Sequence, residues 1–293
     1  MRPFQGTGMV HCLALVKRVC FNFVGRCNMH CDFCYCPFIG GNIDQTLCER
    51  IISRCSSLGA KIVTFGGGDP LLAPNPWALF KHAKSLGLFV HLDTNGLALY
   101  ERDYEKLSHS VDLIGLPLDG NSSELHSSMR SSQRHFAIVH AHLQKLFTYP
   151  IDIKINTVVS RANVHALAEI AISLKQYRIS RWSLYQYWYV DGVSSGVARH
   201  ALADKDYQKA LDGLSQDTYP FTIEPGLSSE RAGTYFFVNH EGTVYASSKE
   251  HEAKYAFLGS IFDDSSIDRW KALVGTSIRN RAITRYPEAL GNS

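Results

Sequence analysis

Short apolar runs alternate with amphipathic segments over the first 187 residues, which is the pattern of a parallel sheet wrapped by helices. The apolar runs predict strands at residues 18–24, 61–65, 88–93, 111–116, 151–159 and 181–187. The segments between them predict helices at residues 44–57, 75–86, 101–108, 133–147 and 164–177. Because each strand ends in a polar or glycine-rich turn, the pattern predicts a partial (β/α)6 TIM-like barrel with its site at the carboxyl ends of the strands.

The pattern changes to shorter elements in the last hundred or so residues. We expect helices at residues 203–214 and 265–280, and strands at residues 221–224, 234–239 and 243–246. The chain is therefore expected to have two parts. Residues 1–187 would form the core barrel, and residues 188–293 a C-terminal α+β extension that covers the substrate site.

Composition narrows the class of protein. The chain has 293 residues, 45% of them hydrophobic, and its net charge is only +3, which does not favour nucleic acid as a partner. No apolar run is long enough to predict a membrane span, and the first eight residues lack the apolar core of a signal peptide. All eight cysteines lie at or before Cys55, which is typical of a reducing compartment rather than of a disulfide framework. We therefore expect a cytoplasmic protein.

Four of the cysteines follow the first predicted strand within ten residues. Cys27, Cys31 and Cys34 are separated by three and then two residues, so one compact loop can direct three thiolates at one metal centre. Three protein ligands leave a coordination position open for another molecule. The alternative is a zinc site completed by Cys36 or His30, but the chain has no second pair of cysteines of the kind that zinc knuckles use.

This spacing, with Phe33 just before the third cysteine, resembles the signature loop of the radical S-adenosylmethionine (SAM) superfamily. The resemblance implies that Cys27, Cys31 and Cys34 hold a [4Fe–4S] cluster, that Phe33 lies by the cofactor, and that SAM chelates the fourth iron. It further implies cleavage of SAM to a 5′-deoxyadenosyl radical, hydrogen abstraction from a substrate, and an external electron donor such as flavodoxin or ferredoxin. The family's partial barrel agrees with the predicted elements.

Two turns resemble SAM contacts of the family. Gly67, Gly68 and Asp69 stand in a turn similar to the family's Gly-Gly-Glu-Pro, which meets the amino group of SAM, although Asp69 is one methylene shorter than glutamate. Thr94 and Asn95 end the third predicted strand, where the family places polar groups near the methionyl moiety or ribose. Each stretch by itself also fits an ordinary turn.

Further candidates follow the fourth, fifth and sixth predicted strands. Arg130 closes a His-x-x-x-Arg pattern similar to that of the family, and its guanidinium suits the carboxylate of SAM or of a substrate. Asn156 and Gln186 stand where the resemblance implies contacts to the ribose or adenine of SAM. Alternation puts Gln186 on the opposite face of its strand from Ser183 and Tyr185, and the sequence leaves open which face looks inward.

The C-terminal region is similar to extensions that bind an auxiliary iron–sulfur cluster in many radical SAM enzymes. Here it has no cysteine, and Ser247 and Ser248 stand where one is expected. We therefore predict a single cluster, because serine is a poor substitute for a thiolate. Tyr235 and Tyr245 are the candidates for supplying a hydrogen atom or an electron to a product radical.

The favoured function is epimerisation, dehydrogenation or dehydration of a small polar metabolite such as a sugar, aminocyclitol or nucleotide. One alternative is a nucleotide dehydratase related to viperin, which residues 154–164 and 181–186 partly resemble. Ser183 stands where those enzymes place a basic residue, and this loss of charge weighs against a triphosphate. The other alternative, a peptide maturase, is disfavoured because only about seventeen residues precede the first strand.

Overall fold

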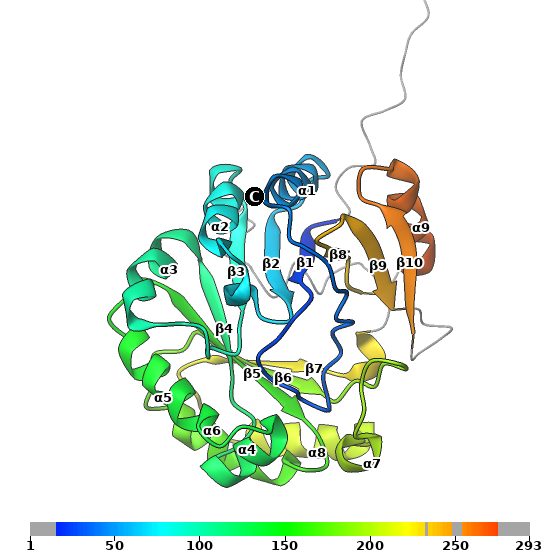
Figure 1. The fold of residues 1–293 in the computed structure, drawn as a ribbon. Coiled ribbons are helices and arrows are strands. Elements are labelled where there is room, and N and C mark those ends of the chain that lie inside the picture. The colour runs from blue at the N-terminus through cyan, green and yellow to red at the C-terminus, as the bar shows by residue number, and fades with distance from the viewer. Residues whose placement is uncertain (1–15, 232–233, 248–253, 275–293) are drawn as a thin grey trace, which may run out of the picture.

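The computed structural model describes residues 16–231, 234–247 and 254–274. It confirms the α/β class with a parallel sheet, and one ten-stranded sheet with the order β10-β9-β8-β1-β2-β3-β4-β5-β6-β7 runs through these residues. Figure 1 shows the sheet curving, with helices along its outer side, while the loop between β1 and α1 passes across the inner side. This arrangement is that of a partial barrel.

The six predicted core strands all form and pair in parallel with their neighbours in chain order. They are β1 (Arg18–Val24), β2 (Ile62–Gly67), β3 (Phe89–Asp93), β4 (Leu113–Pro117), β5 (Asp152–Val159) and β6 (Arg181–Gln186). Since the strands are parallel, their carboxyl ends lie at one edge of the barrel. The turns that carry the candidate site residues therefore meet there.

The helices agree with the predictions in order, and the structure adds two that were not predicted, α4 (Ser123–Arg130) and α7 (Val197–His200). The core and its following segment contain α1 (Gln45–Ser57), α2 (Pro76–Ser85), α3 (Tyr104–Ser110), α4 (Ser123–Arg130), α5 (His135–Leu146), α6 (Leu167–Leu174), α7 (Val197–His200) and α8 (Asp204–Leu214). Short 3-10 helices are η1 (Pro70–Leu72), η2 (Glu101–Asp103), η3 (Val164–Ala166) and η4 (Ser228–Glu230).

Helix α4 was not predicted because its sequence is mostly polar. Its first turn is capped by Ser122, whose Oγ accepts a hydrogen bond of 3.3 Å from the Leu125 N–H. It ends at Ser131, which has a left-handed backbone with φ of 55°. Such a short capped helix has only two apolar residues, Leu125 and Met129, yet it positions Arg130.

The C-terminal region continues the sheet at both of its edges. Strand β7 (Thr222–Gly226) pairs in parallel with β6, whereas β8 (Phe237–Asn239) pairs in parallel with β1. Strands β9 (Thr243–Ser247) and β10 (Tyr255–Ser260) then follow antiparallel, and β10 was not predicted. Helix α9 (Asp264–Val274) confirms the start of the last predicted helix, whose residues 275–280 lie outside the described residues.

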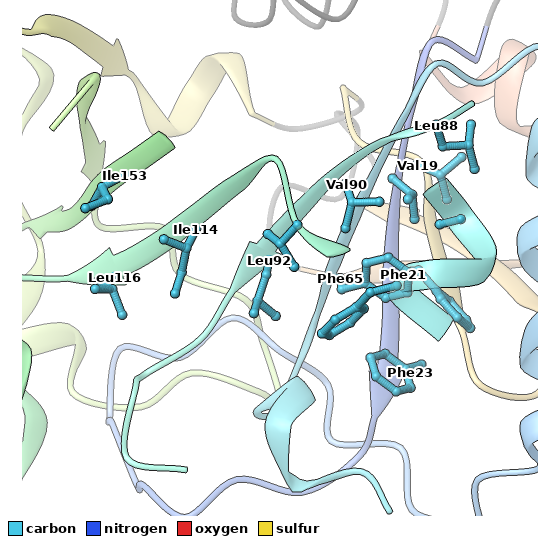
Figure 2. Packing of buried hydrophobic residues seen from close by; sticks show 14 of the residues in the cluster. Val19, Phe21, Phe23, Phe65, Leu88, Val90, Leu92, Ile114, Leu116 and Ile153 are labelled. Atoms are coloured by element: carbon cyan, nitrogen blue, oxygen red, sulfur yellow. The ribbon is translucent and has the colours of Figure 1, made fainter. Parts of the chain in front are cut away.

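The two faces of the sheet differ in polarity. Outward side chains such as Phe21, Phe65 and Leu92 are fully buried between the sheet and the helices (Figure 2). Burying each of these side chains contributes about 1.5–3 kcal/mol to folding. The inner face instead carries polar groups such as Thr64 and His91, both buried. The hydrophobic core thus leaves the inner face free for the site.

None of the helices in the described residues combines the length and the apolar character needed to cross a membrane. Cys48 and Cys55 of helix α1 are buried in the hydrophobic core, where they act as small apolar packing residues.

Candidate functional site

A cavity lies on the inner side of the barrel at the carboxyl ends of the strands, and all three motif cysteines line it. Cys27, Cys31 and Cys34 are partly buried free thiols. The loop folds back on itself through a hydrogen bond of 3.1 Å from the Cys34 N–H to the Cys31 carbonyl. Burial raises the pKa of the Cys31 thiol to about 11, and it also raises the pKa of Cys27 and Cys34. A positive metal centre would offset this cost by favouring the thiolates.

The surroundings of these thiols fit a cluster better than a single zinc ion. Zinc needs all of its ligands about 2–2.3 Å from one centre, whereas a cluster accepts each thiolate at a different iron. Cys36 is buried outside the cavity lining, and His30 is exposed to solvent. The predicted fourth zinc ligands are therefore not part of the cavity.

The glycine-rich turn after β2 packs directly on the cysteine loop. The Gly68 N–H donates to the Val24 carbonyl at 2.7 Å, and a Cβ on Gly68 would lie 1.8 Å from the carbonyl oxygen of Arg26. Gly67 has φ of 110°, a conformation that side chains strongly disfavour. Both glycines line the cavity, so the backbone approaches any ligand there closely.

Asp69, which follows these glycines, does not line the cavity. Its buried carboxylate accepts hydrogen bonds from the Thr94 hydroxyl at 2.8 Å and the Asn95 N–H at 2.9 Å, and another from the Leu71 N–H at 3.0 Å. Burial raises its pKa despite these bonds, which favour the charged form. The placement does not agree with the predicted contact to the amino group of SAM. Asp69 instead holds Thr94 and Asn95, which do line the cavity.

Asn95 connects this turn to the cysteine loop. Its Nδ2 donates to the Cys27 sulfur at 3.5 Å and to the Asn28 Oδ1 at 2.7 Å. A hydrogen bond to the sulfur stabilises the thiolate form of Cys27. The carbonyl of Asn95 in turn accepts from His135 at 2.7 Å.

Two buried histidines extend this connection to the turn after β4. His126 accepts a hydrogen bond of 3.1 Å from the Asp119 N–H, so its other ring nitrogen carries the hydrogen and donates to His135 at 2.8 Å. Burial lowers the pKa of His126 to about 2 and that of His135 to about 4. Both rings are therefore neutral near pH 7, and they fix the two turns relative to each other.

Arg130 lines the cavity and is paired with a buried carboxylate. Its Nε donates to the Asp119 Oδ2 at 2.5 Å, while the other oxygen of Asp119 accepts from the Val158 N–H at 2.7 Å. The guanidinium lies 5.1 Å from the ring centre of Phe33, another cavity residue. Asp119 thus fixes the orientation of Arg130.

Strands β5 and β6 direct Asn156 and Tyr185 into the cavity. The Asn156 Nδ2 donates to Asp93 at 2.7 Å, and the Lys154 Nζ donates to the Tyr185 hydroxyl at 2.9 Å. The structure therefore resolves the open question on β6, because the face with Ser183 and Tyr185 looks inward.

Gln186 consequently lies on the outer face of β6. Its amide nitrogen donates to the Leu202 carbonyl at 2.9 Å and to Asp204 at 2.8 Å. Its Oε1 accepts a hydrogen bond of 2.8 Å from the Ser228 N–H. It does not line the cavity, so its placement does not agree with the predicted contact to SAM.

The two candidate tyrosines are placed differently. Tyr235 lines the cavity. Tyr245 does not, and its hydroxyl accepts a hydrogen bond of 2.7 Å from the Asn22 amide. Burial raises the pKa of Tyr245 well above the usual range of a phenol. Of the two, only Tyr235 therefore faces the space where a substrate would bind.

Several cavity residues were missed by the sequence reasoning. They include Arg18, Asp93, Trp188 and Arg231. Arg18, Cys20 and Asn22 occupy every second position of an otherwise apolar strand, and this alternation is a signal that would have found Arg18. For Arg231, which follows β7, the local sequence carries no comparable signal.

Comparisons with known proteins agree with this geometry. A family model described as Radical SAM superfamily matches residues 21–171. An S-adenosylmethionine-dependent nucleotide dehydratase of Lacinutrix mariniflava is 25% identical over 78% of this chain, and the match covers 50% of that protein. A protein of the same name from Flammeovirga pacifica is 23% identical over 79% of this chain and 82% of its own. Streptococcus suis SuiB bound to its precursor peptide SuiA shares the fold with a TM-score of 0.71 and 16% identity, over 90% of this chain and 67% of that one.

Proposed function

Because the chain belongs to the radical SAM superfamily, we propose that it carries out an epimerisation, dehydrogenation or dehydration of a small polar metabolite, with dehydration of a nucleotide as the favoured reaction. Its cofactors are a [4Fe–4S] cluster and SAM. When bound, they supply a 5′-deoxyadenosyl radical that abstracts a hydrogen atom from the substrate. The protein contributes placement of the reactants and exclusion of water.

We assign the motif thiols Cys27, Cys31 and Cys34 to the cluster. The residues proposed to hold SAM are those predicted ones that line the cavity: Phe33, Gly67, Gly68, Thr94, Asn95, Arg130 and Asn156. Asp69 supports this set indirectly, through its hydrogen bonds to Thr94 and Asn95.

The observation that carries the nucleotide proposal is the positive charge of the inner wall. Arg18 and Arg231 line the cavity, and Lys154 lies buried beside it against Tyr185. Asp93 supplies one negative charge in the same wall, and His91 and Lys154 keep its pKa below the usual range although burial opposes this. The positive charge missing at Ser183 thus comes from Arg18 on β1, Lys154 on β5 and Arg231 after η4, which favours an anionic substrate. The two nucleotide dehydratases among the relatives support the same substrate class.

Loss of water from the substrate radical leaves a product radical that needs one electron and one proton. Tyr235 lines the cavity, and its phenol O–H can deliver both as a hydrogen atom. An external reductant such as flavodoxin or ferredoxin would then restore the phenol. No cysteine follows Cys55, so we propose a single cluster and a cytoplasmic, reducing location.

The test is an anaerobic incubation of the reconstituted enzyme with dithionite, SAM and a metabolite panel of deuterated nucleotides, sugars and aminocyclitols. We expect a deuterated nucleotide to transfer deuterium into 5′-deoxyadenosine, and the same nucleotide without deuterium to lose the mass of one water, as read by mass spectrometry. The Cys27→Ala variant is the control for uncatalysed change. Deuterium transfer only from an uncharged sugar or from an aminocyclitol would contradict the nucleotide proposal.

A further inference from the structure

Arg231 is a buried cation that reaches the cavity from the C-terminal region. It follows η4 directly and only 8% of its surface is exposed, yet it lines the cavity. Taking a guanidinium out of water is costly unless other groups compensate its charge. The groups around Arg231 therefore indicate what the position is built to bind.

Four aromatic rings surround this guanidinium. Its Cζ lies 4.7 Å from the ring centre of Trp188 and 4.9 Å from that of Tyr185. Tyr35 and Tyr235 lie at 5.3 and 5.7 Å. Each of these contacts stabilises the cation and offsets part of its lost hydration. All four aromatic residues also line the cavity. We call Arg231 with these rings the aromatic box.

The aromatic box holds the cation without neutralising it. Tyr235 hydrogen-bonds to Arg231, but no carboxylate of the described residues forms an ion pair with it. The Nε–H of Arg231 is buried and has no hydrogen-bond partner in the described chain. An aromatic ring stabilises a cation but cannot accept the in-plane hydrogen bonds that a guanidinium donates. The remaining donors therefore suit a planar or tetrahedral oxyanion.

A second cation reinforces this preference. The Lys154 Nζ lies 5.3 Å from the ring centre of Tyr185, the same ring that contacts Arg231. One tyrosine ring is thus shared by two buried cations, and their mutual repulsion decreases when an anion binds nearby. Asp93 interacts with Lys154 and offsets part of this charge. Arg130 already has Asp119 as its partner, so Arg231 is the cavity arginine that an anion would complete.

We propose that Arg231 binds an oxyanion group of the substrate, a phosphate or a carboxylate, and so determines that the enzyme accepts anionic substrates. This inference rests on the proposed function only in assigning the cavity to a substrate. The aromatic box fixes the guanidinium, and the anion completes its hydrogen bonds.

The test measures ligand binding by isothermal titration calorimetry on anaerobically reconstituted protein loaded with SAM. The probes are the four ribonucleoside 5′-triphosphates, the matching nucleosides and glucuronate, which distinguish a phosphate from a carboxylate. The variants are Arg231→Gln and Arg231→Lys. Arg102→Gln is the matched control, because Arg102 lies 4.5 Å over the Tyr100 ring but is exposed on the surface.

We expect at least one anionic probe to bind, and Arg231→Gln to weaken it about tenfold to a hundredfold, as for a lost charge-assisted hydrogen bond. The affinity of Arg231→Lys for the probe should lie between those of the wild type and Arg231→Gln, because lysine keeps the positive charge but lacks the paired donors of the guanidinium. SAM affinity should be unchanged in both variants, and Arg102→Gln should match the wild type. Inorganic pyrophosphate should compete with the triphosphates for the wild-type protein, which needs no variant to fold.

The proposal is overturned if nucleosides bind as tightly as their triphosphates and glucuronate does not bind. It is equally overturned if Arg231→Gln binds every probe as the wild type does, or if it loses affinity for SAM instead. Anion binding that depends on Arg231, without deuterium transfer from any nucleotide, would leave this proposal standing and refute the proposed nucleotide reaction.

Discussion

Arg130 and Arg231 line the same cavity, but the protein compensates their charges in different ways. Arg130 shares its charge with the buried carboxylate of Asp119 and lies beside the cysteine loop. Arg231 lies among four aromatic rings and has no carboxylate partner in the described chain. A paired arginine is oriented by its partner, whereas an unpaired one remains available for an anion that arrives with the ligand.

The difference teaches how one barrel can separate two tasks. The side of the cavity around the thiols is held by hydrogen bonds between turns of the core, from Asp69 through Asn95 and from Asp119 through His126. The aromatic box is built largely from residues after β6, which continue the sheet at its edges. The side around the thiols suits a cofactor that is the same in every enzyme of the family. The aromatic box suits a substrate that differs between enzymes.

The thiols give the largest expected effect. Replacing Cys27, Cys31 or Cys34 by alanine should abolish iron binding and 5′-deoxyadenosine formation, because each thiolate ligates its own iron. Iron content and visible absorbance after anaerobic reconstitution measure this. Cys36→Ala is the control and should retain the cluster, as Cys36 lies outside the cavity lining.

Iron quantitation also tests the single-cluster prediction. We expect about four irons per chain, with one site-differentiated iron in Mössbauer spectra. A value close to eight with two distinct cluster signals would show that the inference from the missing C-terminal cysteines is wrong.

The next largest effect concerns the paired arginine. Arg130→Met should lower the free energy of unfolding by about 3–5 kcal/mol, because it leaves the Asp119 carboxylate buried without a partner. The double variant with Asp119→Asn should recover most of this loss in urea unfolding. Its affinity for SAM should still be weaker by about 1.5–3 kcal/mol. Unchanged SAM affinity with lost turnover would instead assign Arg130 to the substrate.

A smaller effect is expected from pH. Burial lowers the pKa of His91 to about 4, so between pH 6.5 and 4 the unfolded chain binds a proton that the folded chain does not. The free energy of unfolding should therefore fall by on the order of 1–3 kcal/mol as the pH falls through this window. His91→Gln should make urea unfolding less dependent on pH, whereas the exposed His109→Gln should not. Equal slopes for both variants would contradict this role of burial.

The smallest expected effect on stability is that of Arg231, and it tests the comparison between Arg130 and Arg231 most directly. Arg231→Met should change the free energy of unfolding by no more than about 1 kcal/mol, because the lost cation–π contacts are offset by removal of a buried charge. Thermal and urea unfolding of Arg231→Met and Arg130→Met, measured side by side, provide the readout. A loss as large as that of Arg130→Met would mean that Arg231 has an anionic partner within the protein.

Much of the fold was predictable because its signals are local. The six core strands and their order follow from apolar runs punctuated by turn residues, and the structure confirms them. Helix α4 and strand β10 were missed, since one is a polar helix held by a cap and the other is an edge strand with an exposed Phe257. Each buries only one or two side chains, so its pattern of buried positions is too short to identify the element.

The sequence by itself determined that three thiolates share one loop, because Cys27, Cys31 and Cys34 are neighbours along the chain. The cofactors followed from the resemblance of this loop to the radical SAM signature. Only the tertiary structure decided which polar residues face the cavity. Packing of helices on the outer face turned Gln186 outward and left Tyr185 inward. Hydrogen bonds from the turn after β3 occupy both carboxylate oxygens of Asp69. The pairing of β7 with β6 then brought Arg231 to the same cavity, a long-range contact that local sequence does not encode.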